Sequence, residues 1–110
     1  MLGSSTACLA SLHRDQLETL NLGDSGFLLL RPLLRLPPMK EPGAFQIIHR
    51  TTEQAHRFNM PFQLGAHSND LPEHGDRATF TVEVGDLLIM GTDGLWDNVF
   101  EEDILSVLAE

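Results

Sequence analysis

The stretch LETLNLGDSGFLLLR, residues 17–31, contains two strand patterns separated by a glycine–aspartate turn. Before the turn, apolar residues alternate with polar ones, which is typical of a half-buried strand. After it, the continuous apolar run 27–30 is typical of a strand buried on both faces. Glycine at position 23 permits the sharp turn between them. The segment therefore predicts two successive strands within a β-rich core.

The rest of the chain extends this β-rich pattern. Residues 5–12 are compatible with a strand and residues 13–16 with a hairpin connection, so we expect three antiparallel strands in the first third of the chain. A further strand is predicted at 45–50. The alternating segment 79–84, the turn Gly85-Asp86 and the apolar run 87–90 predict a hairpin.

Two segments lack a regular pattern, and the chain ends in a predicted helix. Residues 32–44 contain four prolines and residues 51–78 are polar with little periodicity, so we expect a loop and an irregular segment with one helical turn. Acids at 101–103 precede apolar residues at helical spacing, which predicts the start of an amphipathic helix over 101–110.

Composition limits the possible classes of protein. A chain of 110 residues is the size of one small domain, and its formal net charge of −9 disfavours nucleic-acid binding. No apolar run is long enough to span a bilayer, so we expect a soluble protein. The single cysteine, Cys8, lies in an apolar alternation and predicts a buried thiol in a reducing compartment.

Two acidic turns are candidates for chemistry because each places an aspartate beside glycine at the end of a strand. Asp24 lies in the first, and Asp93 and Asp97 lie in the second, four residues apart. Carboxylate oxygens are ligands that Mg²⁺ prefers, and Mg²⁺ often takes only one or two carboxylates plus waters. The same pattern is also typical of ordinary turns in which aspartate caps backbone groups, and spacing alone does not decide between the two.

Several motifs occur in an order that resembles the metal-dependent protein serine/threonine phosphatases of type 2C. They are GSSTA at 3–7, LGDSG at 22–26 and TDGLWDN at 92–98. In addition, TTEQ at 51–54 and FNMPFQL at 58–64 are similar to the mitochondrial-matrix branch related to the T-cell-activation type 2C enzyme. The resemblance covers most of the chain and is weakest at the proline-containing loop.

This resemblance implies an α/β fold, a four-layer αββα sandwich with antiparallel sheets, of which residues 1–110 would be a partial domain. It also implies two Mg²⁺ or Mn²⁺ ions and a metal-activated water that hydrolyses phosphoserine or phosphothreonine in proteins. Asp93 corresponds to a ligand of the catalytic metal pair, and Asp24 and Asp97 to residues that hold a further, weaker metal. A mitochondrial-matrix location is implied by the resemblance alone, because the chain shows no targeting segment.

Other acidic motifs and the phosphate-contacting arginine of that family have no counterpart in this sequence. We therefore expect a shortened phosphatase domain with little or no activity by itself. The alternative is a catalytically silent interaction module derived from a phosphatase domain. The difference between the two is whether the missing acidic motifs are encoded beside this segment.

The remaining candidates are predicted to be structural. The polar residues His67, Asp70, Glu73, His74 and Asp76 lack a zinc-binding pattern and predict a solvated loop. No nucleophile elbow surrounds any serine, which disfavours a serine hydrolase. Cys8 has no neighbour that would lower its pKa, and Trp96 is expected to pack the second acidic turn against the sheet.

Overall fold

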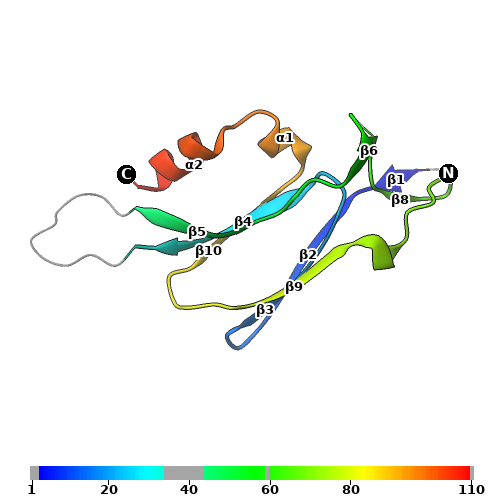
Figure 1. Cartoon of the computed structure of the whole chain (residues 1–110). Helices are drawn as coiled ribbons and strands as arrows, with labels where there is room; N and C mark the ends of the chain where they lie inside the picture. Colours follow the sequence, from blue (N-terminus) through cyan, green and yellow to red (C-terminus); the bar gives the residue numbers. More distant parts are fainter. Residues whose placement is uncertain (1–2, 34–43, 59, 110) are drawn as a thin grey trace, which may run out of the picture.

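The main body of the described chain is two three-stranded antiparallel sheets, with helices along one of them (Figure 1). The computed structural model describes residues 3–33, 44–58 and 60–109. One sheet has the order β2-β3-β9, formed by Ala7–His13, Gln16–Leu22 and Asp76–Thr81. The other has the order β10-β4-β5, formed by Leu87–Gly91, Gly26–Pro32 and Phe45–Arg50. This architecture agrees with the expected antiparallel sandwich.

The hydrophobic core lies where these two sheets face each other. Leu17 of β3 and Phe27 and Leu29 of β4 are buried at its centre. Phe80 packs edge-on against Phe27, with 6.2 Å between ring centroids. Cys8 is half-buried and not fully buried as predicted; it lies against the same cluster, and this burial raises the pKa of its thiol.

Strand β4 is the central strand of its sheet, which explains its uninterrupted apolar sequence. Residues 27–30 are all buried, because one face of β4 contributes to the core and the other faces the helical layer. Helices α1, Asp93–Trp96, and α2, Glu101–Leu108, lie along this outer side (Figure 1). Helix α2 begins at Glu101, the first of the three acids that predict its start.

Two predicted strand pairings are wrong. Strands β3 and β4 belong to different sheets, so the first third of the chain does not form one three-stranded sheet. Strand β9 pairs with β3 and β10 pairs with β4, so the segments on either side of Gly85-Asp86 do not form a hairpin. Periodicity identifies a strand and its buried face, but it does not identify the neighbouring strand.

The segment 51–78 is more regular than predicted. It contains the short strands β6, Ala55–Arg57, β7, Met60–Pro61, and β8, Leu64–Gly65, and the 3₁₀ helix η1, Pro72–His74. Strand β8 pairs with β1, Ser4–Ser5, and β6 pairs with β7. These strands are too short for an alternation to be visible in the sequence.

The predicted loop 32–44 lies mostly outside the described residues. Pro32 ends β4, and the Leu33 N–H donates to the Ala44 carbonyl at 2.9 Å, so the described ends of this segment lie side by side. Within the residues that the structure describes, no helix has the length and apolar character needed to cross a bilayer.

Candidate metal-binding edge of the sandwich

The two acidic turns meet at one end of the β4–β10 ladder. Gly26, at the start of β4, is the register partner of Gly91, at the end of β10. Asp24 lies two residues before Gly26 and Asp93 two residues after Gly91, so antiparallel pairing carries both aspartates to the same edge. The predicted site residues, although about 70 positions apart in the sequence, are thus brought to neighbouring positions in the fold.

Small residues at the ladder's end allow side chains to close over it. A Cβ atom at position 26 would clash with the Thr51 side chain, and one at position 91 would lie 2.7 Å from the Leu95 Cδ2 atom. Thr51 uses this space to accept a hydrogen bond from the Phe27 N–H through its Oγ1 atom at 3.1 Å. The glycine pair therefore serves close packing at this edge.

The first acidic turn is held by contacts on both sides. Gly23 has a φ of 105°, a conformation that favours glycine. The Ser25 and Thr6 hydroxyl groups form a hydrogen bond of 2.7 Å. Asp24, between Gly23 and the buried Ser25, is itself half-buried. The turn therefore presents a single carboxylate from a constrained backbone.

The second acidic turn is a short capped helix. The Thr92 side chain accepts a hydrogen bond from the Gly94 N–H at 3.2 Å, and Asp93 begins α1. The Trp96 indole N–H donates to the Gly91 carbonyl at 2.9 Å, which fixes the helix to the end of β10, as expected for this aromatic residue. Asp97 follows as the C-cap and is exposed, whereas Asp93 is half-buried.

The three carboxylates share one electrostatic environment. Burial raises the pKa of Asp24, and the negative charges of Asp93 and then Asp97 raise it further. A divalent cation would offset this repulsion, and oxygen ligands suit Mg²⁺ or Mn²⁺. The donor chemistry therefore fits such an ion. Among residues 3–33, 44–58 and 60–109, however, no three acidic, histidine or cysteine side chains form a group arranged to hold a metal.

A hollow of about 250 Å³ adjoins Asp24 on the helical side of β4. Trp96 and Arg50 line it together with Glu101, and the Arg50 guanidinium forms a two-pronged ion pair with the Glu101 carboxylate. This pair raises the pKa of Arg50 and links β5 to the start of α2. The one basic residue that lines this hollow is thus paired with an acid of its own.

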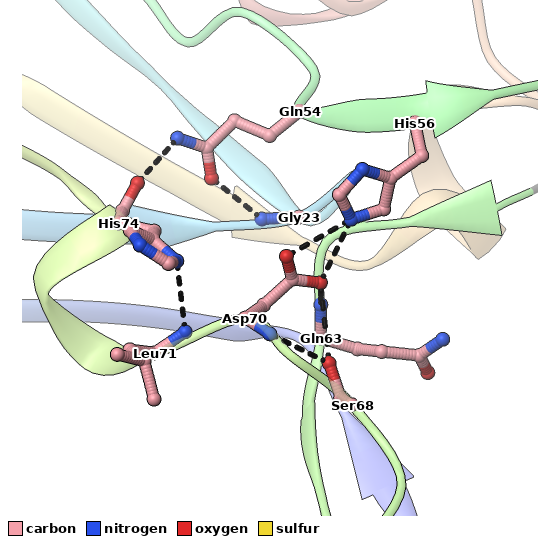
Figure 2. A network of polar contacts seen from close by, with 8 residues as sticks. All are labelled: Gly23, Gln54, His56, Gln63, Ser68, Asp70, Leu71 and His74. Atoms are coloured by element: carbon pink, nitrogen blue, oxygen red, sulfur yellow. Dashed lines mark hydrogen bonds and ion pairs between the residues drawn. The ribbon is translucent and has the colours of Figure 1, made fainter.

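Asp70 is the exception to the expectation of solvated polar residues, because the other four, His67, Glu73, His74 and Asp76, are exposed. The Asp70 side chain is only 7% exposed, and it accepts hydrogen bonds from the Gln63 backbone N–H at 3.0 Å and the Ser68 hydroxyl at 3.3 Å (Figure 2). His56 Nε2 lies 2.9 Å from Asp70 Oδ1. Although burial opposes ionisation, the hydrogen bonds from Gln63 and His56 lower the pKa of Asp70. The carboxylate thus organises the loop from its interior.

Neither Gln54 nor His56 is a predicted site residue. Both lie in the irregular segment, where residue spacing gives no signal, and their partners are distant in sequence. The His56–Asp70 pair lines a hollow of about 560 Å³. A signal was present only in the motif TTEQ, which contains Gln54 and resembles one phosphatase branch.

The chain is similar to known phosphatases over nearly its whole length. The Protein phosphatase PTC7 homolog of Xenopus laevis is 43% identical over 118 aligned positions, which cover 98% of this chain and 36% of the relative. The human protein of the same name is 41% identical, with 98% and 35% covered. No family model matches the chain. The chain spans about a third of the length of these relatives.

A solved structure shares the fold. The X-ray structure of the photosystem II phosphatase PBCP superposes with a TM-score of 0.79 at 28% sequence identity, over 99% of this chain and 39% of the other. Both comparisons agree with the motifs at the two acidic turns. The chain is therefore related over almost all of its residues to the type 2C protein phosphatases, and among them to proteins of the PTC7 kind.

Proposed function

We propose that this chain forms the Asp24–Asp93 portion of a metal-dependent protein serine/threonine phosphatase. The observation that carries the proposal is the Gly26–Gly91 register, which brings two motif aspartates to one edge of the sandwich. The proposed substrate class is phosphoserine and phosphothreonine in proteins. Asp93, Asp24 and Asp97 are the proposed metal ligands, with Mg²⁺ or Mn²⁺ as the ion.

The chain's own contribution to the reaction is positional and electrostatic. A bound divalent ion in such enzymes lowers the pKa of its water, so that hydroxide forms near neutral pH. Asp93 would be held for this purpose by the Thr92 cap and by Trp96, and Asp24 by the sharp turn at Gly23. Since the three described carboxylates form no complete metal-holding group, we expect weak activity from these 110 residues alone.

The experiment transfers this segment into a complete relative. Residues 3–109 replace the matched segment of the Xenopus laevis PTC7 homolog, and phosphate release from a phosphothreonine peptide is measured with and without Mn²⁺. We expect Mn²⁺-dependent turnover that Asp93→Asn lowers by more than about 100-fold, because even outer-shell changes around metals cost about 10–100-fold. Asp15→Asn, in the hairpin turn at the opposite end of β3, is the matched control and retains activity.

Other outcomes separate the alternatives. A folded chimera without turnover would overturn the proposal and favour a silent interaction module. Turnover that survives Asp93→Asn would show that Asp93 is not a metal ligand. Asp93-dependent turnover by the 110-residue chain itself would show that its three carboxylates suffice and that the expectation of an incomplete centre is wrong.

We also propose a mitochondrial-matrix location, supported by the motifs TTEQ and FNMPFQL that resemble that branch. The test is protease protection of the endogenous gene product in isolated mitochondria, before and after rupture of the inner membrane. Protection that is lost only on rupture of the inner membrane is the expected result. Recovery of the protein solely in the cytosolic fraction would contradict it.

A further inference from the structure

One glutamine fastens the Asp24 turn to the segment that follows β5. The Gln54 N–H donates to the Gly23 carbonyl at 3.0 Å, and the Gly23 N–H donates to Gln54 Oε1, also at 3.0 Å. The Gln54 amide nitrogen Nε2 then donates to the His74 carbonyl at 3.0 Å (Figure 2). Phe62 N–H completes the set by donating to the Gln54 carbonyl at 2.9 Å. Every backbone and side-chain amide group of Gln54 is therefore bonded.

Gly23 depends on these bonds because both sheet ladders end just before it. Asn21 is the last residue of β3 paired with β9, and Leu22 is the last paired with β2. Gly23 itself is buried, where an unpaired backbone group is costly. Gln54 therefore substitutes for a neighbouring strand at the point where the chain leaves β3 and turns toward Asp24.

The segment around His74, to which the Gln54 side chain donates, is also fixed. The Leu71 N–H donates to His74 Nδ1 at 2.9 Å, which closes the turn of η1 against its own side chain. The neighbouring Asp70 is buried and bonded to Gln63, Ser68 and His56. Gln54 thus bonds Gly23 to a segment that the buried Asp70 keeps in place (Figure 2). The position of Gly23 therefore depends on the position of that segment.

We propose that Gln54 is a positioning residue for Asp24, which keeps the first acidic turn at the same edge as the Asp93 turn, where the two could share a cation. The inference rests on the proposed metal-dependent function. Asp24 adjoins Gly23 in sequence, and the hydrogen bond that its carboxylate accepts comes from its own backbone, so its placement follows that of the backbone. Gln54 acts through Gly23 and touches neither the cation nor the substrate.

The test compares three variants of the 110-residue chain. Gln54→Leu removes both side-chain bonds, whereas Gln54→Glu keeps an oxygen for the Gly23 N–H and loses only the donation to His74. Gln16→Leu is the matched control, because the Gln16 amide bonds Thr81 at 3.0 Å at the far end of β3. Amide hydrogen exchange at Gly23 and Mn²⁺-induced broadening of backbone NMR signals are measured in each.

We expect Gln54→Leu to speed exchange at Gly23 by about tenfold, the effect of losing one net hydrogen bond. Mn²⁺ should then broaden Asp24 less while it still broadens Asp93, a separation that general destabilisation would not produce. Gln54→Glu should restore the protection of Gly23, and Gln16→Leu should change neither signal. Protection at Gly23 that survives Gln54→Leu, or broadening of Asp24 that is unchanged, would overturn the inference.

The two proposals fail in different ways. If Mn²⁺ broadens neither Asp24 nor Asp93 in the unmodified chain, the metal assignment is wrong and the positioning of Asp24 for a cation is wrong with it. If Mn²⁺ broadens both in every variant alike, the metal assignment stands and only the role of Gln54 is removed.

Discussion

Gly-Asp occurs three times in the chain, at 23–24, 75–76 and 85–86. The first and the last lie where the chain passes from the β2-β3-β9 sheet to the β10-β4-β5 sheet, and these two turns behave in opposite ways. Gly23 and Gly85 have nearly the same φ, 105° and 95°. Asp86 forms an ion pair with Arg31 at 2.9 Å, and this contact lowers its pKa. Asp24 faces other carboxylates, and burial together with their charge raises its pKa.

The difference lies in the partners of each turn. Asp86 closes its own connection, because its carboxylate also accepts the Glu83 N–H at 2.8 Å while it holds Arg31 of β4. The Asp24 turn is closed by Gln54 from outside, which leaves the Asp24 carboxylate available. Asp24 is therefore a better candidate for a metal ligand than Asp86, because its carboxylate is not used to bond a neighbouring strand.

The largest expected difference between the two turns concerns their glycines. A Cβ at position 23 would collide with the Thr6 side chain and the Phe62 carbonyl, whereas one at position 85 would meet Pro32 Cγ at an ordinary 3.5 Å. We expect Gly85→Ala to cost about 1–2 kcal/mol from backbone strain, and Gly23→Ala to cost about 2–5 kcal/mol because overpacking is added. Urea denaturation followed by circular dichroism measures both, and equal costs would contradict the comparison.

An intermediate effect is expected from removal of the Asp86 charge. Asp86→Asn weakens the bond to Arg31, and we expect a loss of about 1–2 kcal/mol, the range for a hydrogen bond to a charged group reduced by solvent at the exposed side of Arg31. Asp24→Asn removes repulsion instead, so we expect unchanged or slightly increased stability without metal. Thermal unfolding in the presence of a chelator compares the stabilities of the two variants. A larger loss of stability for Asp24→Asn than for Asp86→Asn would show that Asp24, and not Asp86, has the structural role.

The smallest expected effect is the pH dependence of these two carboxyl groups. The lowered pKa of Asp86 stabilises the fold above the ordinary value of 3.8, and this stability is lost as the pH falls through the lowered value. The raised pKa of Asp24 has the opposite sign: its contribution is complete below 3.8 and is lost as the pH rises through the raised value. Between pH 3 and 6, the urea midpoint of Asp24→Asn should therefore increase relative to that of the unmodified chain as the pH rises. A difference in midpoint that does not change with pH would contradict this.

Single strands and helices could be predicted from the sequence, whereas the pairing of the strands could not. The buried run 27–30 and the acids at 101–103 mark their elements directly, because burial and helix-end charge act on local residues. The pairing of the strands on either side of Gly23-Asp24 and of Gly85-Asp86 was missed, because it depends on contacts such as Arg31–Asp86, 55 positions apart. Gln54 and Asp70 were missed for the same reason.

The central claim is that the turns of Asp24 and Asp93 form one cation-binding edge and that the turn of Asp86 does not. The most direct measurement is a titration of the isotopically labelled chain with Mn²⁺, followed by the broadening of its backbone amide signals. We predict that residues 23–26 and 92–98 broaden together at the lowest Mn²⁺ concentrations while residues 83–87 remain sharp. Broadening of 83–87 to the same extent, or of only one of the two acidic turns, would contradict the claim.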